Sequence, residues 1–266
     1  MTLQTFRTLT YIVTCALLAG GCGITNRSVR GNGAVRTEPR DVSDFSNVVL
    51  NGIGTVELRQ TGAASLTVEA EENLLPLLTT SAENGTLEIS VKSGVDLRPT
   101  KPVIFHVTVG RIETVRVAGS GRVDAGPIKT PQLTAAISGS GDVAIETIEA
   151  DRLVGRISGS GAIKLGRVNV KTLHCEISGS GDAQLAGQAD EADVSISGSG
   201  SIHADDLRCR AADVSIAGSG SARIATSEKL TADVSGSGSL RYRGSPSVVQ
   251  TNVSGSGSVS RAGDAG

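Results

Sequence analysis

The tripeptide Gly-Ser-Gly recurs from residue 119 onwards, and this repeat limits the possible folds of the chain more than any other feature. Its eight copies begin at Gly119, Gly139, Gly159, Gly179, Gly198, Gly218, Gly236 and Gly255, at intervals of 18 to 20 residues. A constant period near 20 residues is typical of solenoids, in which each unit stacks on the one before it. The repeat therefore predicts a stack of coils, each about 20 residues long.

Apolar and polar residues alternate on both sides of each Gly-Ser-Gly. Two residues before the first glycine, every copy has valine or isoleucine: Val117, Ile137, Ile157, Ile177, Ile196, Ile216, Val234 and Val253. Four residues after it, every copy is again apolar, and a third apolar column precedes the glycine by six residues, from Leu133 to Val249. Alternation with period two indicates strands. Three short strands per coil, stacked in register, predict an all-β parallel β-helix.

The Gly-Ser-Gly motif is expected to be structural. Glycine tolerates a positive φ at a bend, and its missing side chain lets successive corners stack closely. We expect the serine hydroxyls, from Ser120 to Ser256, to hydrogen-bond from rung to rung. A glycine-rich loop that binds phosphate needs a following helix and usually a lysine, and neither is found here.

The composition limits which side chains can form the core and which classes of partner can bind. The chain has 34 glycines, no tryptophan and 2% aromatic residues, so small and β-branched side chains must fill a narrow interior. Its 25 basic and 27 acidic residues are interspersed, with a net charge of -2. A basic patch with interleaved aromatics, the mark of a nucleic-acid-binding protein, is missing, and we expect no nucleic-acid partner.

The N-terminus has the pattern of an export signal. Arg7 precedes an apolar stretch from Leu9 to Leu18, which is too short to span about 30 Å of hydrocarbon as a helix. Ala19-Gly20-Gly21-Cys22 follows and resembles a bacterial lipobox. We interpret residues 1–21 as a signal peptide and Cys22 as the lipidated residue, which anchors the protein to a membrane. Cleavage near Gly21 without a lipid is the alternative.

These signals predict the organisation of the chain. Residues 22–43 are expected to form a linker, 44–117 irregular N-terminal coils, 118–260 regular Gly-Ser-Gly coils, and 261–266 a disordered tail. Because glycine rather than aspartate follows Cys22, we expect an outer-membrane lipoprotein that faces the periplasm or the cell surface.

Two cysteines lie within the repeats. Cys175 precedes its Gly-Ser-Gly by four residues and Cys209 by nine, so the two belong to different columns of different coils. A disulfide needs Cα atoms within about 7 Å, and we therefore expect two buried free thiols.

Beyond the repeat, the chain resembles a known family, the head GIN domain of bacterial auto-transporter adhesins, over about residues 44–260. The resemblance rests on Phe45-Ser46-Asn47-Val48, on the stretches 51–56 (NGIGTV), 68–74 (VEAEENL) and 84–89 (NGTLEI), and on the Ser-Gly-Ser-Gly series after them. It implies a single-stranded, right-handed parallel β-helix in the envelope of Gram-negative bacteria. The family provides no catalytic residue and no cofactor that could be transferred to this chain.

Paired carboxylates raise an enzymatic alternative, a lyase or glycosidase acting on polysaccharides. Asp193 and Asp213 share a column one coil apart, about 5 Å, near the spacing of a retaining glycosidase pair. Asp142 and Asp182 share another column two coils apart. We interpret all four as solvated outward positions, because sugar cleavage also needs aromatic platforms, and only Phe45, Phe105 and Tyr242 remain after processing.

A metal site is not expected either, because His106, His174 and His203 fall in three different columns. The sequence thus predicts a structural or adhesin-like interaction module without catalytic residues, cofactor or metal. Its expected partners are a membrane, through the lipid, and a glycan or an envelope protein.

Overall fold

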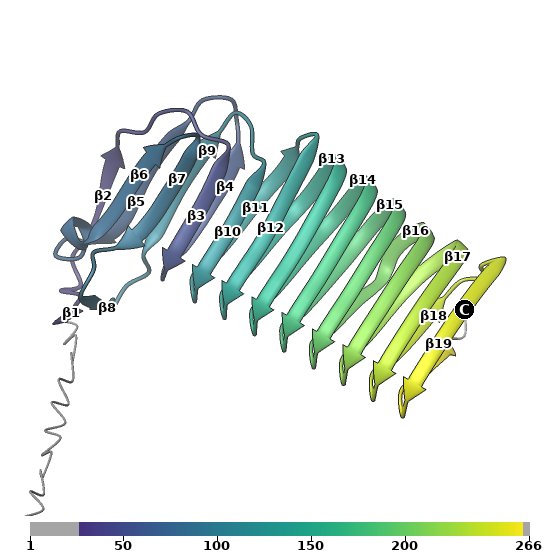
Figure 1. Cartoon of the computed structure of the whole chain (residues 1–266). Coiled ribbons are helices and arrows are strands. Elements are labelled where there is room, and N and C mark those ends of the chain that lie inside the picture. The colour runs from purple at the N-terminus through teal and green to yellow at the C-terminus, as the bar shows by residue number, and fades with distance from the viewer. Residues whose placement is uncertain (1–26, 263–266) are drawn as a thin grey trace, which may run out of the picture.

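The chain folds into a rod of stacked strands in the computed structural model, which describes residues 27–262 (Figure 1). The N-terminal part comprises β1 (Arg27–Arg30), β2 (Val35–Arg40), β3 (Asn47–Gly52), β4 (Thr55–Gln60), β5 (Ser65–Glu71), the 3-10 helix η1 (Leu75–Leu77), β6 (Leu78–Glu83), β7 (Thr86–Val91), β8 (Val95–Arg98) and β9 (Ile104–Val109). The signal peptide over 1–21 and the lipidated Cys22 lie outside the described residues.

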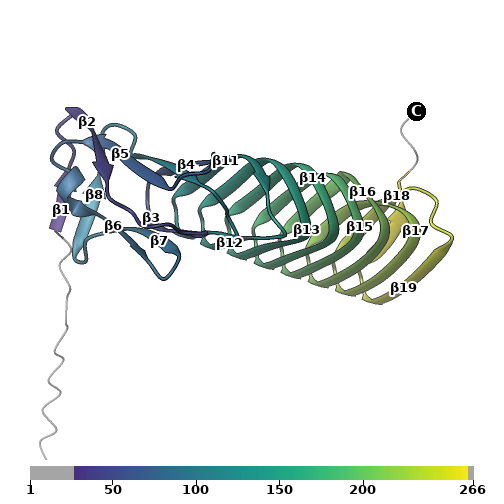
Figure 2. The ribbon, with the colours of Figure 1, turned by 90° about the horizontal axis from the view of Figure 1, so that it is seen from above.

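The remaining strands form the repeats. They are β10 (Thr114–Gly119), β11 (Arg122–Lys129), β12 (Gln132–Gly139), β13 (Asp142–Gly159), β14 (Ala162–Gly179), β15 (Asp182–Gly198), β16 (Ser201–Gly218), β17 (Ser221–Gly236), β18 (Ser239–Arg243), β19 (Val248–Gly255) and β20 (Ser258–Arg261). Each of β13 to β16 is a whole bent coil that pairs in parallel with the next (Figure 2). The predicted all-β solenoid is confirmed, with about seven turns.

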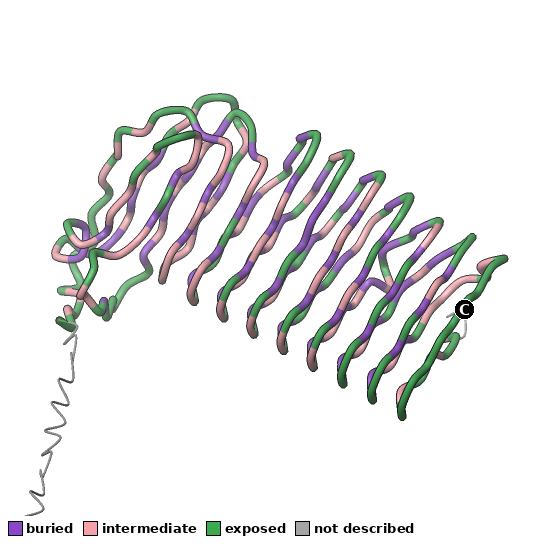
Figure 3. The backbone as a smooth tube through the Cα atoms, viewed as in Figure 1, coloured by how far each residue is buried: buried purple, intermediate pink, exposed green. Residues whose placement is uncertain are grey.

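The predicted columns form the core. Ile157, Ile177 and Ile196 pair in register on successive coils, and Ile177 is completely buried, whereas its neighbour Glu176 is half-buried on the outside. Buried and exposed residues alternate along every inner coil (Figure 3). Cys175 and Cys209 are buried free thiols in different columns, as expected.

The corners stack through their backbones. Gly159 has a φ of +127°, and a Cβ added there would lie 2.3 Å from the carbonyl oxygen of Gly139. The backbone N–H of Ser160 donates to that same oxygen at 2.9 Å. The expected hydroxyl ladder is wrong, because within residues 27–262 the serine hydroxyls of the corners make no bond to one another and the backbone amides form the rungs instead.

The sequence indicated irregular coils over residues 44–117, and the structure shows a different arrangement there. β3 and β4 do begin the parallel stack beneath β10 and β11. However, β5 runs antiparallel to both β2 and β9, and β6 runs antiparallel to β7. A tight turn at Asn84 (φ 51°) and Gly85 (φ 73°) joins β6 to β7, which is the typical chemistry of a two-residue hairpin. The N-terminal third is therefore a mixed cap on the end of the solenoid.

Two predicted boundaries also shift. Residues 27–40 of the expected linker form β1 and β2, because β8 and β5 offer them backbone partners along their edges. At the other end, Arg261 belongs to β20, which pairs with β18, so the expected tail cannot begin at residue 261.

The buried side chain of Glu71 links separate segments of this cap by hydrogen bonds. Its carboxylate is fully buried and accepts hydrogen bonds from the backbone N–H groups of Gly33 (2.6 Å) and Thr100 (2.7 Å) and from the Thr100 hydroxyl (2.5 Å). Burial by itself would raise the pKa of Glu71, but these bonds and one from the Lys101 N–H outweigh it and lower the pKa to about 2. One charged side chain thus ties the β1–β2 turn to the loop before β9.

The corner geometry predicts that Gly159→Ala lowers the free energy of unfolding by at least about 2 kcal/mol, because it combines a positive φ with a backbone clash. Gly126→Ala is the matched control, since its added Cβ meets nothing within 4 Å. In urea denaturation, the free energy of unfolding of Gly126→Ala should equal that of the wild type or exceed it slightly. Equal losses for the two variants would contradict the stacking argument.

The lowered pKa of Glu71 predicts how acid acts on the cap. A carboxyl group with a folded pKa of about 2 and an ordinary value of 4.5 stabilises the fold fully above pH 4.5. That contribution is lost as the pH falls from 4.5 towards 2. Urea midpoints of the wild type should therefore fall more steeply with acid than those of Glu71→Gln. Glu72→Gln, at an exposed neighbour, should follow the wild type, and parallel curves for all three would refute the assignment.

Candidate functional site

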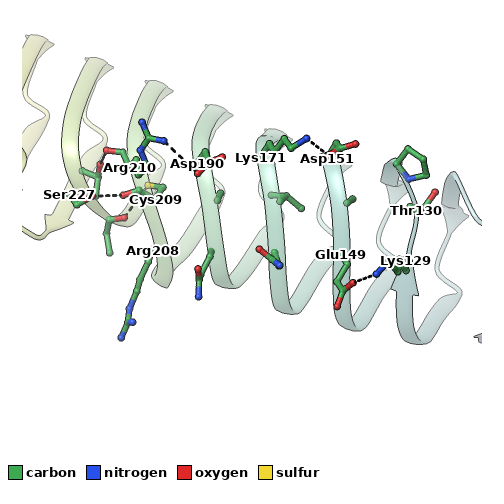
Figure 4. A pocket seen from close by; sticks show the side chains of 18 of the residues that line it. Lys129, Thr130, Glu149, Asp151, Lys171, Asp190, Arg208, Cys209, Arg210 and Ser227 are labelled. Atoms are coloured by element: carbon green, nitrogen blue, oxygen red, sulfur yellow. Dashed lines mark hydrogen bonds and ion pairs between the residues drawn. The ribbon is translucent and has the colours of Figure 1, made fainter.

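A groove of about 980 Å³ runs along the rod axis on one side of the repeats (Figure 4). Three rows of side chains line it, each with one residue from each successive coil. The groove lies where the coil bends, because exposed Asn169 and Lys171 flank buried Val170 and the next buried residue is Leu173. This break in alternation turns the two outer rows outwards as rims.

The floor of the groove is a row of small side chains. From one coil to the next it contains Thr130, Ala150, Val170, Ala189, Cys209 and Thr226. Val170 and Ala189 are each 6% exposed, so the floor contributes little surface of its own. At about 4.8 Å per rung, the five steps of the row span about 24 Å.

One rim is a ladder of alternating charges. Its members are Asp151, Lys171, Asp190 and Arg210, which lie along the same edge in Figure 4. Lys171 Nζ lies 2.6 Å from Asp151 Oδ1, and Arg210 contacts both Asp190 (3.8 Å) and Glu228 (3.0 Å). The hydrogen bond to Asp151 raises the pKa of Lys171, and the one to Glu228 raises the pKa of Arg210. These charges are therefore largely satisfied within the protein.

The opposite rim is less satisfied. It contains Lys129, Glu149, Asn169, Gln188 and Arg208, and only its first pair forms an ion pair, at 2.8 Å. That contact raises the pKa of Lys129 through its hydrogen bond to Glu149. Within residues 27–262, the side chains of Asn169, Gln188 and Arg208 have no hydrogen-bond or ion-pair partner. Two amides and one cation are thus free to meet a ligand.

Cys209 contributes a thiol to the floor but not a nucleophile. Burial raises its pKa to about 11, and its Sγ donates to the carbonyl oxygen of Ala225 at 3.0 Å. Cys175, inside the coil, has a pKa raised to about 12 by burial. Both side chains therefore remain neutral thiols at physiological pH.

The structure brings Asp193 and Asp213 together on adjacent rungs, as the column had indicated. It adds His174 to the same column, with Nδ1 at 2.9 Å from Asp193 Oδ2, beside a cavity of about 440 Å³. Sequence reasoning missed this contact, although His174 precedes its Gly-Ser-Gly by five residues, as the two aspartates do. The side chain of Asp193 is 62% exposed, which leaves it solvated rather than sequestered for acid–base work.

The other expected positions stay apart. Asp142 and Asp182 both pair with Ala162 in one column, and Asp142 contacts Arg122 at 3.4 Å. His106 lies in the N-terminal cap between Glu57 and Glu69, far in sequence from His203 on β16. Among residues 27–262, no three histidine, cysteine or acidic side chains are grouped so that they could hold a metal ion.

The chain is therefore a β-solenoid with an open groove along one side of its repeats. The family comparison agrees with that class. The chain belongs to the family described as "Putative auto-transporter adhesin, head GIN domain", whose model matches residues 44–246. The resemblance seen in the sequence is therefore confirmed, and the protein is adhesin-like. No helix among residues 27–262 is long and apolar enough to cross a membrane.

Solved structures with the same fold support this assignment. A "putative lipid binding protein" from Parabacteroides distasonis is 30% identical with a TM-score of 0.84, and the match covers 89% of this chain and 100% of that one. A "putative adhesin" from Parabacteroides merdae is 28% identical with a TM-score of 0.84, over 89% and 99% of the two chains. No curated protein matches the chain.

Proposed function

We propose that this protein is an exported envelope lipoprotein that acts as an adhesin-like module and binds an extended, largely neutral glycan in the groove. The observation that carries the proposal is the groove itself, an open channel with one set of side chains per rung. The lipid at Cys22 would hold the rod to the outer membrane. The family and the Parabacteroides adhesin, which share the fold, support an adhesive role.

The charge of the groove favours a neutral polymer. Its rims carry four basic residues (Lys129, Lys171, Arg208 and Arg210) and three acidic ones (Glu149, Asp151 and Asp190), so the difference is only +1. The amides of Asn169 and Gln188 can both donate and accept, which suits the repeated hydroxyls of a glycan. This rim is therefore suited to hydrogen-bonding a sugar chain rather than to neutralising a polyanion.

The spacing of the rungs along the groove also fits a glycan better than an extended peptide. Rungs recur about every 4.8 Å, whereas an extended peptide presents equivalent side chains about every 6.6 Å and falls out of step. A pyranose unit advances by close to one rung, so successive sugars can each meet the side chains of one rung.

The Asp193–Asp213 pair does not have the features of a catalytic carboxylate pair, and we therefore favour a non-enzymatic role for this protein. Catalysis by two carboxylates needs one whose environment keeps it protonated. Asp193 is 62% exposed and bonded to His174 instead. A polysaccharide-active enzyme is the alternative.

The groove predicts that Asn169→Ala/Gln188→Ala weakens glycan binding by about tenfold or more, because two unpaired amides are lost. Binding of residues 22–266 with Cys22→Ser to a panel of immobilised neutral and acidic polysaccharides measures the effect. Lys164→Ala/Gln184→Ala, a pair in register on another wall, is the control and should bind as the wild type. Undiminished binding by the groove variant, or binding to acidic polymers alone, contradicts the proposal. Sugar release lost in Asp193→Asn/Asp213→Asn supports the enzyme instead.

Anchoring at Cys22 predicts that metabolic labelling with palmitate marks the wild type and not Cys22→Ser. The other cysteine in the N-terminal stretch provides the control, since Cys15→Ser should keep the label. Equal labelling of wild type and Cys22→Ser, or no label in either, would rule out the anchor.

A further inference from the structure

The two ends of the rod are finished differently. The N-terminal end is covered by the antiparallel cap, whereas the C-terminal coil has an open edge in the described part of the chain (Figure 1). All eight residues of β19 are exposed, and the strand pairs only with β17. Val249 and Val253 are 45% and 41% exposed, although their partners on β17, Leu230 and Val234, are 0% and 2% exposed.

An open solenoid end is costly in water. It presents unpaired backbone groups and a slice through the apolar core, so solenoids require a covering element at each end. Exposed edges that must not pair usually carry charges or proline. One edge strand at the N-terminal end, β2 (VRTEPR), has these features, because it contains Arg36, Glu38, Pro39 and Arg40. β19 (VVQTNVSG) contains no charged residue and no proline.

We propose that β19 pairs with β19 of a second copy of this chain, antiparallel and about a two-fold axis. The absence of charge on β19 means that two identical edges meet without like-charge repulsion, and Val249 and Val253 become covered. In head-to-tail stacking, β19 would meet β6, the outermost strand of its own wall at the N-terminal end, and β20 would meet β2. The charges and Pro39 of β2 disfavour the second of these contacts. The contact is therefore isologous and closes as a dimer instead of growing into a filament.

This pairing has a geometric consequence for adhesion. Because the described N-terminal and C-terminal residues lie at opposite ends of one rod, a tail-to-tail dimer is a rod of twice the length with an N-terminus at each end (Figure 1). If both copies carry the lipid of the proposed function, their anchors lie as far apart as the dimer allows. Copies from two facing membranes can then join end to end, which is a homophilic contact.

Sedimentation velocity of residues 22–266 with Cys22→Ser, which retains every described residue, tests the pairing separately from lipid and glycan. The expected species is a dimer, and Asn252→Lys should weaken it about tenfold or more by placing like charges across the axis. Ser215→Lys is the matched control, because residues 215 and 252 both pair with Asp233. Residue 252 lies on the open edge, whereas residue 215 lies on an inner coil. It should leave the dimer unchanged, and thermal melting checks that both variants fold.

Cysteine cross-linking tests the orientation. Antiparallel pairing brings one residue among Gln250, Thr251 and Asn252 close to its own copy, so one of the three single cysteine variants should form a disulfide-linked dimer. Ser215→Cys should form none. A monomeric wild type, a series of longer polymers, or a dimer that Asn252→Lys leaves intact would each overturn the proposal. None of these outcomes depends on whether the groove binds a glycan.

Discussion

The close stacking of glycine corners is the contact on which the rest of the structure depends. At Gly159 the space for a side chain is already taken by the Gly139 carbonyl oxygen, and Gly179 is blocked by Gly159 in the same way. Each corner amide then bonds to the corner below. Because every coil turns at the same place, the columns that flank the corner fall into register. The narrow interior of the repeats is filled with valine, isoleucine, leucine and alanine side chains.

The same regularity creates the groove. A solenoid copies one cross-section from coil to coil, so a bend that recurs in each coil becomes a channel along the repeats. Here the bend lies at the row of Val170, and the rims inherit one side chain per rung from each coil. In such a fold, equivalent side chains form rows along the axis rather than one local cluster. This explains why the exposed Asp193 and Asp213 form a pair without forming a sequestered site.

Regularity also leaves the ends as special places. The N-terminal end departs from the repeat through a hairpin and antiparallel pairing, and the buried carboxylate of Glu71 holds its segments together by hydrogen bonds. The C-terminal end keeps the repeat up to its last described strands and thereby exposes Val249 and Val253. A rod built in this way has two distinct surfaces, a groove along its side and an open edge at the C-terminal end of its described part.

The sequence alone determined the solenoid, its period and its inward columns, because these depend on local alternation repeated eight times. It also placed Cys175, Cys209 and the two aspartates in their correct columns. Only the tertiary structure decided the antiparallel cap, since pairing of β5 with β2 and β9 depends on contacts distant in sequence. It also decided the groove, because a row of alanine, valine and threonine reads as core until the bend of the coil turns its neighbours outwards.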